Sequence, residues 1–119
     1  MDVKNIRKQL AKFRDEAFGW ITGLLKEMDI DELRISDFSS CPPVIREDKL
    51  NGDLTFTLDA IRLNDGRLSF DCSNCCENHS WGKEEIDTDT LVEIVHFLSN
   101  PDLIAAIKAE IQEERETQT

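Results

Sequence analysis

Long apolar runs, glycine-rich segments and basic side chains are all scarce in this chain of 119 residues. No apolar run approaches the roughly 20 residues that a membrane-spanning helix requires, and the first ten residues, MDVKNIRKQL, lack the apolar centre of a signal peptide. We therefore expect no membrane insertion and a cytoplasmic location. The chain has no glycine-rich phosphate loop and no dinucleotide-binding fingerprint, so the common nucleotide-binding signatures are excluded.

Basic side chains are few relative to acidic ones, with 14 Lys and Arg against 25 Asp and Glu. Nucleic-acid binding depends on Lys and Arg that neutralise phosphates, so the composition argues against direct binding of DNA or RNA. The imbalance is uneven. Residues 1–14 carry five bases and one acid, a local charge of +4, and the remainder carries nine bases and 24 acids, a charge of −15. Two interpretations stay open: a surface that maintains solubility, or an acidic surface that meets a basic partner.

The first 28 residues carry apolar side chains at alternating intervals of three and four, which keeps these side chains on one side of a helix. The stripe consists of Val3, Ile6, Leu10, Phe13, Ala17, Trp20 and Leu24, and it ends at Met28. Lys4, Lys8 and Lys12 lie on the opposite face. Such a stripe suits a core helix or a coiled-coil seam, and the bulk of Phe and Trp favours the core helix. We expect a long N-terminal helix.

The segment 54–72 has the pattern of an antiparallel hairpin that turns at residues 65–66. Pairing around this turn places the apolar side chains of both strands on one face of the sheet. The residues up to Leu58 alternate in the opposite phase, which predicts a bulge near Asp59. With that bulge, Leu58 lies opposite Cys72, and Cys72 becomes the last inward-facing residue of its strand.

Two segments that precede the hairpin have weaker patterns. Leu33 and Ile35 alternate with polar residues as a short strand would. Two consecutive prolines and an Asn-Gly pair predict that residues 39–53 form a connection without a strand.

Two helices are expected in the C-terminal third. Thr90 and Glu93 have the spacing of a capping box at the start of the first helix, and Pro101 opens the second. The polar tail from about residue 112 is expected to fray. The chain has no internal repeats, so we expect one domain, residues 1–119, of the α+β class. This domain combines a long N-terminal helix, a small antiparallel sheet of two or three strands and two C-terminal helices.

The segment CSNCCENH, residues 72–79, concentrates three of the four cysteines and one of the two histidines. The candidate zinc ligands are Cys72, Cys75, Cys76 and His79, with Cys41 as a distant fifth. Two Cys-x-x-Cys or Cys-x-x-His pairs have the spacing that tetrahedral zinc favours, but the pairs overlap. The adjacent Cys75 and Cys76 are also expected to point in divergent directions. Plain reduced cysteines in a turn, a zinc site and a redox pair remain open, in that order of preference.

No catalytic constellation is identifiable, so we expect no enzyme and no required cofactor other than the zinc just considered. His96 falls on the outward face of its expected helix. A Cys–His nucleophile made from Cys75 or Cys76 with His79 lacks an orienting third group and an oxyanion donor.

Two functional hypotheses from different classes follow. The first is a small acidic protein-interaction module, a regulator or inhibitor that offers carboxylates to the basic surface of a partner. The candidate partner-binding residues are Glu84, Glu85, Asp87 and Asp89. These carboxylates also have a structural explanation as a solvated run near the start of a helix. The alternative is a zinc-binding domain that uses the cysteine cluster.

The first helix also predicts self-association. Its basic outer face belongs to a chain that is otherwise strongly acidic, so carboxylates of a second copy are favourable neighbours. A small sheet that covers only part of the apolar stripe would leave the rest exposed, and a symmetric dimer is the commonest way to cover such area. We expect a homodimer that forms through the first helix.

Overall fold

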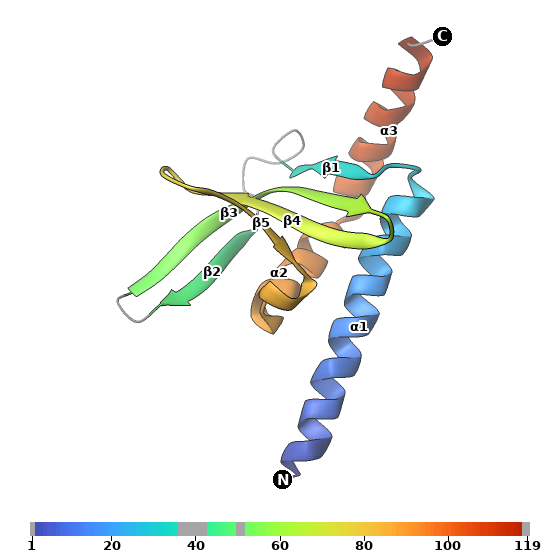
Figure 1. The fold of residues 1–119 in the computed structure, drawn as a ribbon. Coiled ribbons are helices and arrows are strands. Elements are labelled where there is room, and N and C mark those ends of the chain that lie inside the picture. Colours follow the sequence, from blue (N-terminus) through green and yellow to red (C-terminus); the bar gives the residue numbers. More distant parts are fainter. Residues whose placement is uncertain (1, 36–42, 50–51, 118–119) are drawn as a thin grey trace.

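The structure is a computed structural model that describes residues 2–35, 43–49 and 52–117. The elements follow in the order α1 (Val3–Glu27), β1 (Glu32–Arg34), β2 (Val44–Lys49), β3 (Gly52–Asn64), β4 (Arg67–Ser73), β5 (Asn78–Gly82), the short 3₁₀ helix η2 (Lys83–Glu85), α2 (Thr88–Leu98) and α3 (Pro101–Thr117). Figure 1 shows how the helices and strands are arranged. The α+β class, the long N-terminal helix and the two C-terminal helices are confirmed.

The sheet has five antiparallel strands, and the prediction of two or three was too small. The long strand β3 pairs with both β1 and β2 on one side and with β4 on the other, and β4 pairs with β5. The strands that the sequence did not predict are β2, which lies within the expected connection, and β5, which follows the cysteine turn. Both are edge strands: main-chain hydrogen bonds hold β2 to β3 and β5 to β4. Their sequences show little alternation of apolar and polar residues.

The hairpin between β3 and β4 has the predicted register. Ile61 pairs with Phe70, Leu58 pairs with Cys72, and the register shifts between Leu58 and Ala60, so the predicted bulge is confirmed. Asp65 and Gly66, the two turn residues, have φ of 51° and 76°. A two-residue turn of this kind requires positive φ at both positions, which Asp tolerates and Gly adopts freely.

The helices cover one face of the sheet, and the core lies between them and the strands (Figure 1). The sheet contributes Phe56, Leu58, Ile61, Leu68, Phe70 and Cys72, and α2 contributes Leu91, Ile94 and Leu98. The C-terminal half of α1 is buried in this core at Ala17, Phe18, Ile21 and Leu25, and Phe13 packs against it while remaining partly buried. The apolar residues at the start of the predicted stripe are solvent-exposed, with Val3 59% and Leu10 46% accessible. The predicted stripe therefore lines the core only in part.

The two C-terminal helices begin and end slightly differently from prediction. The N-cap of α2 is Asp87, whose Oδ1 accepts the Thr90 N–H at 2.7 Å, so the predicted capping box of Thr90 and Glu93 does not form. Helix α3 continues past residue 112 to Thr117. Arg115 near its end donates to the carbonyl oxygen and the carboxylate of Asp29, at 2.9 and 3.1 Å, and so ties the tail to the turn after α1.

The molecule is elongated, with extents of 56 × 35 × 27 Å. Figure 1 shows the reason: the N-terminal half of α1 and the C-terminal half of α3 project from the body in opposite directions. In the described ranges no single helix is long and apolar enough to cross a membrane, although α2 and α3 taken together, with a 67° bend, reach that length and composition.

Candidate functional site

The cysteine cluster forms the turn between β4 and β5. The side-chain oxygen of Asn74 accepts the backbone N–H groups of Cys76 and Glu77, at 2.9 and 2.8 Å. The backbone N–H of Asn74 donates to the Glu77 carbonyl at 3.0 Å. An asparagine that binds its own turn in this way fixes the backbone of the two exposed cysteines between these residues.

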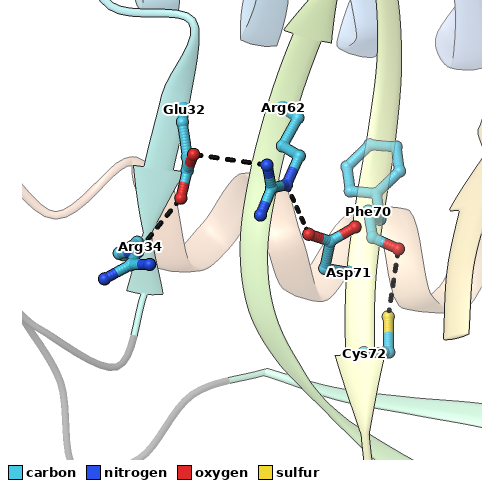
Figure 2. Close-up of polar contacts among 6 residues, drawn as sticks. All are labelled: Glu32, Arg34, Arg62, Phe70, Asp71 and Cys72. Carbon is cyan, nitrogen blue, oxygen red and sulfur yellow. Dashed lines mark hydrogen bonds and ion pairs between the residues drawn. The ribbon is translucent and has the colours of Figure 1, made fainter. Parts of the chain in front are cut away.

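The three described cysteines divide into one buried and two exposed thiols. Cys72 faces the core, as predicted, and its thiol points to the carbonyl oxygen of Phe70 at 3.5 Å (Figure 2). Cys75 and Cys76 lie together on the turn with their sulfur atoms 3.2 Å apart, so the prediction that they diverge is wrong. The tight turn at Asn74 brings the two side chains to the same side.

His79 lies opposite Cys72 in the register of β4 and β5, but its ring has other partners. Its Nε2 lies 2.9 Å from a carboxylate oxygen of Glu77. The ring stacks on Trp81, with centroids 5.4 Å apart and planes 9° apart, and meets the ring of Phe56 edge-on at 5.1 Å. His79 and Trp81 therefore cover the edge of the core at Phe56.

Metal ligation and nucleophilic attack both require thiolates, and the pKa values of Cys72 and Cys76 are raised. Burial raises the pKa of Cys72 to about 12, and the nearby carboxylates of Asp59 and Asp71 add to the shift. The hydrogen bond with Cys75 raises the pKa of Cys76, with desolvation and the charge of Glu77 as smaller causes.

The described part of the chain brings no three His, Cys, Asp or Glu side chains together as a metal site. Cys41, the fifth candidate ligand, lies outside the described residues. The zinc hypothesis therefore remains a prediction for measurement.

The predicted partner-binding carboxylates lie at one corner of the molecule, where η2 leads into α2. We call Glu84, Glu85, Asp87 and Asp89 the acidic corner; all four are exposed. Asp87 is occupied as the cap of α2. No ion pair in the described ranges involves the other three, so their charges face solvent uncompensated.

A single side chain from α1 holds the backbone of this corner. Arg14 donates through Nη2 to the carbonyl oxygens of Lys83 and Ile86, at 2.9 and 2.6 Å, and through Nη1 to the hydroxyl of Thr88 at 3.3 Å. Its guanidinium also lies 5.4 Å from the ring centre of Phe18. Arg14 was not among the predicted site residues, although one signal was present: it continues, at heptad spacing, the face of α1 that is buried at Phe18, Ile21 and Leu25.

The acidic corner continues onto the outer face of α2. Asp89 lies three residues before Val92 and four before Glu93, so it neighbours both side chains on that face. All three are exposed, and Val92 is 49% accessible, unusually high for a large apolar residue of this chain. The surface thus combines carboxylates with one apolar contact point.

A second group of charges lies on the sheet face opposite the helices, but it is self-compensating. Figure 2 shows an ion-pair ladder across β1, β3 and β4 that runs Arg34–Glu32–Arg62–Asp71. The pKa of Arg62 is raised, and the largest cause is the hydrogen bond that Arg62 donates to Asp71. The ladder contains two cations and two anions, so it contributes no net charge and offers little to a charged partner.

These features define a two-layer α+β protein with an exposed, rigidly held acidic corner and no gathered metal ligands in its described ranges. None of the known family models, curated proteins or solved structures matches the chain.

Proposed function

We propose that this protein is a small interaction module whose acidic corner binds a basic surface of a protein partner. The observation that carries the proposal is the clamp by Arg14. It fixes the backbone that presents Glu84 and Glu85 without neutralising either carboxylate. As a regulator or inhibitor, the module acts by occupying the basic site of its partner.

The clamp matters energetically because binding normally requires a loop to lose conformational freedom. A segment that is already held by three hydrogen bonds from Arg14, two of them to backbone carbonyls, loses less conformational freedom on binding, so more of the electrostatic attraction appears as affinity. The strong negative charge of the chain after residue 14 also speeds encounter with a basic surface.

The surface beside the corner supports a protein partner over a simple polycation. Val92 is exposed one turn from Asp89 on α2, and an apolar side chain beside charged ones is a common arrangement in protein interfaces. The partner surface that fits it has Lys or Arg side chains around a small apolar depression.

The test uses a corner variant that carries Glu84→Gln, Glu85→Gln and Asp89→Asn and leaves Asp87 in place to cap α2. Tagged wild-type protein and the variant are exposed to an extract of the source cells at low salt, and the retained proteins are identified by mass spectrometry. A basic protein that the wild type retains is then purified, and its affinity is measured by calorimetry. We expect the corner variant to bind it roughly tenfold more weakly or worse, because three charges that attract it are lost.

The matched control removes the same amount of charge from other places. It carries Asp65→Asn, Asp102→Asn and Glu110→Gln, which are exposed carboxylates outside the corner. This control should bind like the wild type. Equal weakening of both variants would mean that only net charge matters, and affinity that is insensitive to salt between about 50 and 300 mM would contradict an electrostatic interface.

A further inference from the structure

We propose that two copies of this chain associate through the projecting N-terminal halves of α1, which pack antiparallel around a two-fold axis near residue 8. This proposal does not depend on the acidic corner binding another protein. It is based on the exposure of that helix half, the symmetry of its apolar spacing and the distribution of charge.

The first observation is exposure. The N-terminal half of α1 projects beyond the body in Figure 1. Val3 and Leu10 are exposed and Ile6 is partly buried, while Phe13, at the base of the projecting half, is partly buried against the core. An apolar stripe on a projecting helix is unfavourable in water unless another surface covers it.

The second observation is that the spacing of this stripe is self-complementary. The intervals between Val3, Ile6, Leu10 and Phe13 are three, four and three, which read the same in both directions. In an antiparallel pair centred on residue 8, Val3 of one copy therefore lies opposite Phe13 of the other, and Ile6 lies opposite Leu10. A two-fold axis requires this reciprocity, because the same surface must match itself.

The overlap ends where the two bodies begin. Eleven residues of helix span about 16 Å at 1.5 Å per residue. The helix of each copy starts at Val3, which lies opposite Phe13 of the other copy, and Phe13 packs against the core of its own body.

The third observation is charge complementarity. Residues 1–14 carry a net charge of +4, and the rest of each chain carries −15. The antiparallel arrangement brings the start of one helix to the level of Arg14 in the other copy, where Arg14 holds the acidic corner. The positive N-terminal segment of one copy thus lies beside the negatively charged body of the other, while Lys4, Lys8 and Lys12 all lie on the face of the helix away from the seam.

Sedimentation equilibrium with a matched pair of variants tests the association. Leu10→Glu places a charge in the seam at an exposed position, so the fold is retained, and circular dichroism verifies this. Val44→Glu makes the same change at a comparably exposed position on β2, with 40% accessibility. We expect the wild type and Val44→Glu to be dimeric at about 100 µM, a concentration suited to a small interface, and Leu10→Glu to be monomeric. A wild type that is monomeric at that concentration overturns the proposal, and so does a dimeric Leu10→Glu variant.

Disulfide cross-linking tests the antiparallel register. In a background where Cys41, Cys75 and Cys76 are replaced by serine, a chain that carries Val3→Cys and Phe13→Cys should form links between positions 3 and 13 of different chains. The two positions are about 15 Å apart along one helix, too far to join within a chain. Peptide maps that show links 3–3 and 13–13 would establish parallel packing and contradict the arrangement. Lys8→Cys, on the outward face, serves as the control and should remain unlinked.

Discussion

Arg14 is the residue on which the acidic corner most depends. It lies in the basic N-terminal segment of the sequence, yet its guanidinium is not available to a partner, because three oxygen atoms of residues 83–88 accept its hydrogen bonds. These acceptors would otherwise need solvent or another donor. Arg14 thus converts a local positive charge into a link between α1 and the start of α2.

Replacing Arg14 with methionine should lower the free energy of unfolding by about 2 kcal/mol, in the range measured for hydrogen bonds to charged groups. Methionine keeps much of the aliphatic volume beside Phe18 but donates no hydrogen bond. Urea denaturation followed by circular dichroism measures the change. Arg7→Met, at an exposed position of the same helix, is the control and should change the unfolding free energy by less than about 0.5 kcal/mol.

Cys72 makes stability depend on pH in the alkaline range. Its folded-state pKa is raised to about 12 from an ordinary value of 9.0, so the folded protein keeps a proton that the unfolded chain releases above pH 9. The stabilisation is complete below pH 9 and is lost as the pH rises towards 12, at roughly 1 kcal/mol per pH unit.

Unfolding experiments between pH 8 and pH 11 on the wild type and Cys72→Ala measure this effect. The variant should be less stable at pH 8, because it leaves a small cavity, but its stability should fall less steeply with pH. Parallel slopes for the two proteins would show that other groups cause the alkaline destabilisation.

At the scale of elements, the cap of α2 gives a direct test of where that helix begins. Asp87→Ala should destabilise the protein by about 1 kcal/mol, because the Thr90 N–H loses its acceptor. Asp87→Asn retains an acceptor and should cost much less. Asp89→Ala, in the first turn but without a capping bond, is the matched control, and a larger loss there than at Asp87 would contradict the observed start of α2.

The turn between β4 and β5 gives a test of the zinc hypothesis. In the described ranges the exposed pair Cys75 and Cys76 has no third ligand arranged for a metal ion, and His79 is engaged with Glu77 and Trp81. We therefore expect elemental analysis of protein purified without chelator to give a zinc-to-chain ratio far below one. A ratio near one in the wild type that disappears in the double variant Cys75→Ser, Cys76→Ser would restore the hypothesis.

The whole molecule divides into a compact body and projecting helix ends. Removing residues 1–10 should leave the body folded, because no residue in that segment is buried in the core. The melting temperature should fall by only a few degrees, since the lost groups contribute little beyond exposed helix. Calorimetry under dilute conditions, where the full-length chain is monomeric, makes the comparison independent of association; loss of the cooperative transition would show that the segment supports the body.

The sequence alone determined those features that depend on neighbouring residues. The hairpin, its turn at Asp65 and Gly66 and the bulge beside Leu58 follow from side-chain alternation and from the backbone that each residue tolerates, and the structure has all three. The long first helix and the two C-terminal helices follow from local periodicity in the same way. The inward orientation of Cys72 was predicted through this register.

Tertiary structure decided the features that depend on distant residues. Strands β2 and β5 form because β3 and β4 offer free edges, which no pattern within their own sequence reveals. The exposure of the first half of α1 depends on how far the body extends along the helix. The acidic corner was recognisable as a run of carboxylates, but the hydrogen bonds that hold it come from Arg14, which is separated from its acceptors by 69 to 74 positions. Such contacts arise only when the chain packs, because they join segments whose local sequences carry no record of each other.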